Sequence, residues 1–68
     1  MQHANTPLEE LALDADSFDC LKSVGLETVG DLISRTEAEL DAIPNFGNKN
    51  IDEVRDRLAR LGLKLRGE

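Results

Sequence analysis

The pattern of apolar and polar positions is clearest near the end of the chain, where it predicts one long helix. Its apolar residues recur at intervals of three, four and three, as Ile51, Val54, Leu58 and Leu61. This is the spacing of a single helical face. On the opposite face Glu53 and Arg57 form an acid-before-base pair at four residues, and Gly62 follows where a helix normally ends. We therefore expect a helix over 48–61.

Three shorter helices are predicted upstream from their caps, with expected ranges 15–24, 29–34 and 37–42. Asp14 and Thr28 are suitable N-caps for the first two, and Gly25 ends the first. Thr36 and Glu39, three residues apart, form the capping box of the third. The residues expected in the core are Leu21, Leu32, Leu40, Ile51, Val54 and Leu58.

The expected fold class is all-α, a compact bundle of four short helices with a longer last helix. The third helix, the turn at 43–48 and the last helix have the layout of a helix-hairpin-helix. Residues 7–66 form one domain, in which 7–13 lies across the core as an extended or single-turn segment. Residues 1–6 are expected to be a flexible tail, and residues 66–68 are expected to trail into solvent.

Composition limits the class of protein. With 68 residues, 40% hydrophobic and 32% charged, the sequence suits one small globular helical domain. One cysteine excludes an intrachain disulfide and fits a reducing compartment. No apolar run approaches the length of a membrane span. The expected localisation is therefore cytoplasmic.

The net charge of −6 is unevenly placed along the sequence. Residues 1–42 carry ten acids against two bases, whereas residues 43–68 carry six bases against four acids. A domain this acidic does not bind nucleic acid through its overall charge, so any DNA contact has to be local and to involve the second half. The sequence holds no set of paired metal ligands, catalytic triad or nucleotide-binding loop. We therefore expect a binding module and not an enzyme, with no cofactor and no metal.

The turn before the last helix is the candidate binding feature. Asn45, Gly47 and Asn48 are residue types that tolerate a positive φ. The free N–H groups at the start of the helix, beside Lys49, suit a phosphate. The same residues also suit a simple helix cap, and local chemistry alone favours that second interpretation.

From Leu8 to Leu65 the sequence resembles the C-terminal domain of the bacterial RNA polymerase α subunit. The resemblance is carried by Cys20-Leu21-Lys22, Thr28-Val29-Gly30-Asp31-Leu32, Arg35-Thr36-Glu37, Asn45-Phe46-Gly47 and Leu61-Gly62-Leu63. It implies a compact helical domain with a helix-hairpin-helix. It also implies docking on the minor groove of A·T-rich promoter DNA upstream of the core promoter, and contacts with the sigma factor and transcription activators.

The resemblance places the DNA-contacting face at the start of the first helix and at the turn. The family pattern Arg-x-x-Asn-Cys-Leu-Lys begins here at Asp16, which stands where an arginine enters the groove, and Asp19 stands where the family has asparagine. The family turn Gly-x-Lys-Ser reads Gly47-Asn48-Lys49-Asn50. The resemblance therefore implies these nucleic-acid-binding positions: Asp16, Asp19, Lys22, Gly47, Asn48, Lys49 and Asn50.

The replacement of a cation by an anion at Asp16 is unfavourable for DNA binding. At some 6 Å from a phosphate, with an effective dielectric of about 20, each charge unit is worth roughly 2–3 kcal/mol before salt screening. We therefore expect minor-groove binding by this domain to be weak or absent.

The resemblance also implies protein contacts. Glu10 falls in the family's sigma-facing acidic patch, and the residues that match its activator-facing helix are Thr36, Glu37 and Glu39. Two functions stay open. One is a DNA-binding transcription module with a reduced contribution from the first helix. The other is a protein–protein interaction domain that docks on polymerase, sigma factor or an activator without DNA. Neither involves a membrane or a small-molecule substrate.

Overall fold

The structure is a computed structural model that describes residues 3–68. The helices, in order along the sequence, are the 3-10 helix η1 (Leu8–Leu11) and the α-helices α1 (Ala15–Ser23), α2 (Val29–Ile33), α3 (Glu37–Asp41) and α4 (Asn48–Arg60). Strand-like pairing in the described residues is limited to one isolated bridge between Pro7 and Thr28. The all-α prediction is confirmed, and each predicted α-helix agrees with the structure to within one residue. None of the helices described is long and apolar enough to span a membrane.

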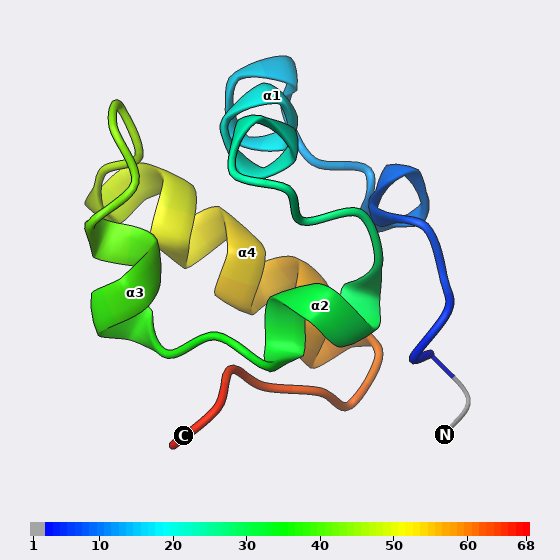
Figure 1. Ribbon diagram of the computed structural model, residues 1–68. Coiled ribbons are helices and arrows are strands. Elements are labelled where there is room, and N and C mark those ends of the chain that lie inside the picture. The colour runs from blue at the N-terminus through cyan, green and yellow to red at the C-terminus, as the bar shows by residue number, and fades with distance from the viewer. Residues whose placement is uncertain (1–2) are drawn as a thin grey trace.

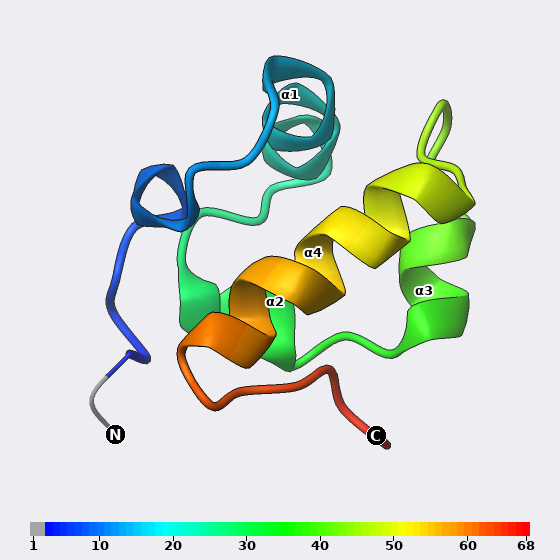
Figure 2. The ribbon, with the colours of Figure 1, turned by 180° about the vertical axis from the view of Figure 1, so that it is seen from behind.

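The helices are arranged around α4, which crosses the middle of the molecule (Figure 1). The view from behind shows α3 beside the beginning of α4 and α2 beside its second half (Figure 2). The apolar side chains they enclose are Leu8, Leu11, Leu21, Leu26, Val29, Leu32, Leu40, Ile43, Phe46, Ile51, Val54, Leu58 and Leu65. All six residues expected in the core belong to this set.

The apolar face of α4 departs from the prediction only at its last position. Leu58 is fully buried, whereas Leu61, which the spacing places on the same face, is 37% exposed. The physical reason is that α4 ends at Arg60, and Gly62, with a left-handed φ of 75°, turns the backbone around. Leu65 on the returning segment fills the core in its place and is 1% exposed.

The predicted N-cap residues begin all three short α-helices, but only those of α2 and α3 cap through their side chains. Thr28 and Thr36 each accept a hydrogen bond from the N–H three residues on, and a carboxylate at that third position closes both capping boxes. Asp14 is the N-cap residue of α1, as predicted, but its side chain makes no capping bond. Its backbone N–H instead donates to Oε2 of Glu53 (2.6 Å), so α1 is held by a side chain of α4.

The carboxylates that close the two capping boxes are stabilised in their charged form. Asp31 accepts the backbone N–H groups of Glu27 (3.1 Å) and Thr28 (3.2 Å), and Glu39 accepts that of Thr36 (2.9 Å). These hydrogen bonds lower the pKa of both carboxyl groups below their ordinary values. Both helix starts are therefore sensitive to acid.

The C-terminal residues are bound to the domain. The backbone N–H of Arg66 donates to the carbonyl of Arg35 (3.0 Å). The Glu68 carboxylate pairs with Arg55, which also pairs with Glu37, and hydrogen bonds from Arg55 lower the pKa of Glu68. Residues 66–68 are exposed, as predicted, but they do not trail free, because their charges have partners on α3 and α4.

The segment before η1 is bonded to the start of α2. Val29 N–H donates to the Thr6 carbonyl (2.7 Å), and Gly30 N–H donates to the Ala4 carbonyl (3.2 Å). A Cβ at Gly30 would lie 2.4 Å from that Ala4 oxygen, so the close approach requires glycine. Residues 1–2 of the predicted tail lie outside the described residues, and the domain boundary at residue 7 stays a prediction.

Ala12, which follows η1, has an unusual backbone conformation. Its φ of 56° and ψ of 42° are left-handed, a region that alanine rarely adopts. The Ala12 carbonyl accepts a hydrogen bond from Nε of Arg57 on α4 (3.3 Å). The connection between η1 and α1 is thereby attached to α4.

The first prediction concerns the core. Leu58→Ala is expected to lower the free energy of unfolding by about 2–5 kcal/mol, because it leaves a cavity at a fully buried position. Leu61→Ala removes the same atoms from a site that is 37% exposed and should cost less than about 1 kcal/mol. Urea unfolding followed by circular dichroism measures both. Equal midpoints for Leu58→Ala and the parent would show that the buried face of α4 is wrongly assigned.

The second prediction concerns acid stability. The pKa of Asp31 is lower in the folded protein than its ordinary value of 3.8, so its charge stabilises the fold above pH 3.8. That contribution is lost as the pH falls through the lower folded-state pKa. Asp31→Asn should therefore lose less unfolding free energy than the parent between about pH 5 and pH 2 in a urea series. Asp41→Asn, at an exposed position of α3, is the control and should keep the parent's pH dependence. The same dependence in all three proteins would contradict the role of Asp31.

Candidate nucleic-acid interface

The two stretches that the sequence analysis assigns to DNA contact come together in the fold. The start of α1 and the start of α4 border one hollow of about 390 Å³, lined by Asp16, Asp19, Cys20, Asn45 and Asn50. These residues are far apart in the sequence and share a surface because α1 packs on α4. Of the expected positions, Asp16, Asp19 and Asn50 therefore lie around one site.

Hydrogen bonds through a buried serine attach α1 to α4 next to this hollow. Ser17 is fully buried, and its hydroxyl donates to Oε1 of Glu53 (2.5 Å) and accepts from Nδ2 of Asn50 (2.8 Å). The other oxygen of Glu53 accepts the backbone N–H of Asp14. Because each of these groups bonds across the two helices, the network fixes where α1 begins relative to α4.

Asn50 also organises the turn before α4. Its Oδ1 accepts the backbone N–H of Gly47 (3.0 Å), so both ends of its amide are engaged within the protein. One amide N–H remains for a ligand, since the group has two. Gly47 has an ordinary extended backbone (φ −100°, ψ −171°), and Asn45 is the residue of the turn with a left-handed φ, 66°.

The first turn of α4 offers hydrogen-bond donors to an anion. The backbone N–H groups of Asn48, Lys49 and Asn50 have no acceptor within residues 3–68, because α4 begins its bonding with Ile51 N–H to the Gly47 carbonyl (3.0 Å). The Lys49 side chain is exposed beside them. Together these groups form an arrangement suited to one phosphate.

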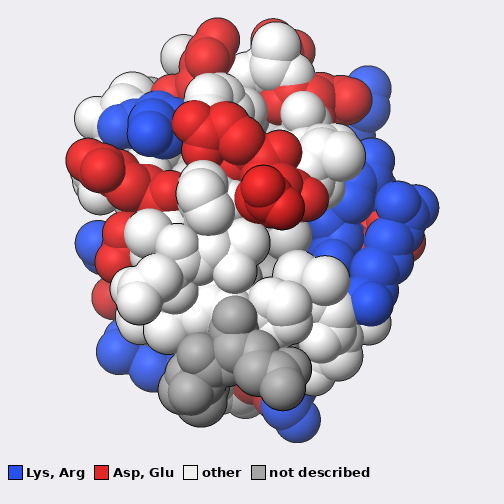
Figure 3. Space-filling view, turned by 90° about the vertical axis from the view of Figure 1, so that its right-hand side faces the viewer, with Lys and Arg blue, Asp and Glu red and all other residues white. Residues whose placement is uncertain are grey.

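The start of α1 presents the opposite charge at the same hollow. Asp16 and Asp19 are exposed, and neither pairs with a cation within 4.0 Å in the part of the protein described. Figure 3 views the side of the molecule that carries η1, away from the turn, and shows acidic side chains gathered across the upper part of that face. An anion approaching the turn meets attraction from Lys49 and the N–H groups of α4, and repulsion from Asp16 and Asp19.

The other expected site residues lie away from this hollow. Lys22, in the last turn of α1, has its Nζ 5.7 Å from the centre of the Phe18 ring. Glu10 is exposed on η1. The remaining candidates for protein contact, at the start of α3, are Thr36, Glu37 and Glu39. Because η1 and α3 lie on opposite sides of the molecule, these candidates form two separate surfaces (Figures 1 and 2).

Sequence reasoning missed Ser17 and Glu53. The available signal is that Ser17 lies four residues before Leu21, on the buried side of α1, where a polar group needs a partner. Glu53 was expected on the outer face of α4, but its side chain is only 12% exposed because it faces α1. Its predicted pair with Arg57 is confirmed at 3.8 Å.

Comparison with known proteins gives one family. The model of the family described as the C-terminal domain of the alpha chain of bacterial RNA polymerase matches residues 1–60. The DNA-directed RNA polymerase subunit alpha of Cutibacterium acnes is 56% identical over 61 residues, which are 90% of this protein and 18% of that one. The corresponding subunit of Frankia alni is 50% identical over 60 residues, 88% of this protein and 17% of that one. The sequence thus spans less than a fifth of the length of these curated relatives.

A solved structure supports the same family. The NMR structure of the C-terminal domain of the RNA polymerase alpha subunit from Helicobacter pylori matches with a TM-score of 0.81 at 33% identity. The match covers 93% of this protein and 54% of the solved one. The fold expected from the resemblance is therefore confirmed.

The third prediction tests the network between α1 and α4. Ser17→Ala should lower the free energy of unfolding by about 1–3 kcal/mol, because it leaves Glu53 and Asn50 each short of a partner. Ser23→Ala, on the same helix, removes an exposed hydroxyl bonded only to the Cys20 carbonyl and should cost less than about 0.5 kcal/mol. Urea unfolding compares the two, and equal losses would show that Ser17 does not hold the helices together.

Proposed function

Because this protein belongs to the family of C-terminal domains of the bacterial RNA polymerase alpha chain, we propose that it is a transcription-associated binding module of the polymerase. The domains of this family are non-catalytic, so the module contributes binding contacts and catalyses no reaction itself. As the resemblance implies, we propose that its partners are promoter DNA upstream of the core promoter, the sigma factor and transcription activators. We propose that this domain acts in the cytoplasm.

We further propose that DNA binding by this domain is weak. The observation that carries this proposal is the position of Asp16 and Asp19, which border the same hollow as Asn50 at the start of α4. A phosphate seated at the turn would lie near these carboxylates. Each charge unit at about 6 Å opposes binding by roughly 2–3 kcal/mol before salt screening.

The turn supports a residual contact with the DNA backbone. Its three free N–H groups and Lys49 suit a phosphate, and phosphate contacts position a protein on DNA without reading its sequence. The residues that enter the groove in the family pattern are the ones replaced here, by Asp16 and Asp19. Binding should therefore be both weak and indifferent to sequence.

The acidic surface over η1 and α1 favours a second candidate function (Figure 3). Glu10 is exposed on it, and Asp16 and Asp19 have no cation partner in residues 3–68. Such a surface complements a basic patch on the polymerase, the sigma factor or an activator. In that case the domain is a protein–protein interaction module without a DNA role.

The fourth prediction separates these functions by fluorescence anisotropy with A-tract and mixed-sequence duplexes in a salt series. The unaltered domain should bind both duplexes equally, at or weaker than about 10⁻⁴ M. Asp16→Arg with Asp19→Asn changes the local charge by about +3 and should restore a preference for narrow-groove A-tracts. In that background Lys49→Ala should weaken binding to all sequences and reduce the salt slope by about 0.9.

A charge-matched control is available elsewhere on the surface. Glu27→Arg with Glu10→Gln makes the same change in net charge at exposed positions outside the hollow, and should not create A-tract preference. Micromolar, A-tract-selective binding by the unaltered domain would contradict the loss of DNA contact at α1. A double substitution at Asp16 and Asp19 without effect would favour the protein-interaction function.

A further inference from the structure

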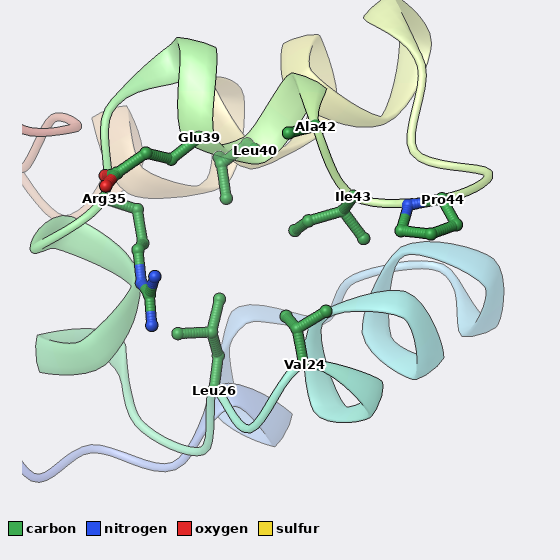
Figure 4. Close-up of a pocket in the computed structure, with 8 residues that line it drawn as sticks. All are labelled: Val24, Leu26, Arg35, Glu39, Leu40, Ala42, Ile43 and Pro44. Carbon is green, nitrogen blue, oxygen red and sulfur yellow. The ribbon is translucent and has the colours of Figure 1, made fainter.

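A second hollow lies on another part of the surface, where the end of α1 faces the end of α3. Figure 4 shows Val24 and Leu26 on one side of it and Leu40, Ile43 and Pro44 on the other. The hollow has a volume of about 190 Å³. It shares no residue with the candidate nucleic-acid interface.

The apolar part of this hollow is open to solvent. Val24 is 42% exposed, and it and Leu61 are the exposed large apolar residues among those described. Sites for small molecules usually measure about 300–1,000 Å³. This hollow alone is smaller, and its size suits one apolar side chain of a partner.

The side chain of Arg35, which forms no ion pair within 4.0 Å in the described residues, borders the apolar hollow. Arg35 has no carboxylate within 4.0 Å in residues 3–68, whereas each of the other arginines is ion-paired, namely Arg55, Arg57, Arg60 and Arg66. The carboxylates around Arg35 are already engaged, because Asp31 accepts backbone N–H groups and Glu39 accepts both a backbone N–H and Arg66. Besides these backbone hydrogen bonds, the charge of Arg35 also lowers the pKa of both carboxyl groups, but its N–H groups have no side-chain acceptor in residues 3–68 and are left to bind an outside acceptor.

The apolar hollow continues into a more polar one. Leu26, Arg35 and Glu39 line both, and the second hollow, of about 340 Å³, also includes Arg66. Asp31 also lines the second hollow, and Arg66 is paired there with Glu39. A ligand lying along the two hollows would place an apolar group beside Val24 and an anionic group beside Arg35. The two hollows together are called the Arg35 groove below.

We propose that the Arg35 groove binds a short segment of a partner protein in which an apolar side chain is followed by acidic residues. The apolar side chain is buried against Val24 and Ile43. A carboxylate accepts hydrogen bonds from Arg35, whose planar fork matches a carboxylate in two parallel bonds. The net charge of −6 repels acidic segments in general, so recognition depends on this local cation.

This inference relies on the proposed function only in treating the domain as a binding module. The surface differs from the acidic one over η1 and α1, and it selects a partner of the opposite charge. The DNA-binding experiment above can fail while the Arg35 groove still binds its segment, because none of its substitutions lines the groove.

The fifth prediction is tested by titrating the ¹⁵N-labelled domain with the peptide N-acetyl-Ser-Leu-Asp-Glu-Ser-amide and following amide chemical shifts by NMR. Shifts are expected at Val24, Arg35 and Ile43. They should shrink when alanine replaces the peptide's leucine, or when asparagine and glutamine replace its acids. Arg35→Gln should weaken binding by at least about tenfold, as expected for loss of a hydrogen bond to a charged group.

Matched variants keep the test specific. Lys64→Gln removes one exposed cation outside the groove and should change the affinity by less than about twofold. Val24→Ser should weaken binding, whereas Leu61→Ser, at the other exposed large apolar residue, should not. Because all four positions are exposed, the amide spectrum of each free variant should report an intact fold.

Several outcomes would overturn the proposal. These are groove shifts that survive Arg35→Gln, an equal response to the alanine peptide, or peptide shifts confined to the candidate nucleic-acid interface. Groove shifts with a mixed-sequence DNA duplex but not with the peptide would assign Arg35 to phosphate. Groove shifts that grow with protein concentration alone, with a matching increase in mass by ultracentrifugation, would assign the groove to a second copy of the domain.

Discussion

The placement of α1 on α4 depends on one buried polar contact, the Ser17 hydroxyl between Glu53 and Asn50. Burying these groups would cost free energy without partners, and each finds its partner on the other helix. Asn50 also holds the Gly47 N–H, so the same contact sets the start of α1 and the turn before α4. The shape of the candidate nucleic-acid interface is therefore fixed by side chains largely turned toward the protein interior.

The acids of this domain serve different purposes, which the net charge does not reveal. Asp31 and Glu39 close capping boxes, and Glu68 binds Arg55. Asp16, by contrast, pairs with no cation in the described residues but lies in the first turn of α1, where a negative charge interacts favourably with the helix dipole. The carboxylate that opposes DNA contact thus favours the helix that carries it. A cation at position 16 would favour DNA contact but would lose this stabilisation of α1.

Local patterns predicted most of the fold, because helices and their caps are encoded within a few residues. Thr28 and Thr36 cap as expected, and the apolar spacing identified the buried face of α4 as far as Leu58. The contacts that local patterns missed are those between residues distant in the sequence. Asp14 is held by Glu53, and Glu68 is bound by Arg55, contacts that no spacing along the sequence reveals.

The candidate site was predictable in its parts but not in its arrangement. The turn at Gly47–Asn50 and the acids of α1 stand out in the sequence, and the resemblance joined them on one face. The bonds that occupy both ends of the Asn50 amide appear only once α1 lies on α4. The Arg35 groove is less predictable still, because it depends on which arginines already have partners.

The left-handed alanine after η1 has a consequence for how this domain tolerates change. Residues with a Cβ atom, apart from asparagine and aspartate, cost about 1–2 kcal/mol in that conformation. Ala12 adopts it while its carbonyl binds Arg57. Glycine or asparagine at position 12 would relieve much of this cost without altering that carbonyl or any residue that lines the candidate nucleic-acid interface or the Arg35 groove. The domain therefore has an accessible route to higher stability that is separate from both surfaces. The stability gained at position 12 would offset substitutions that weaken the fold, so residues of either surface could change to bind new partners.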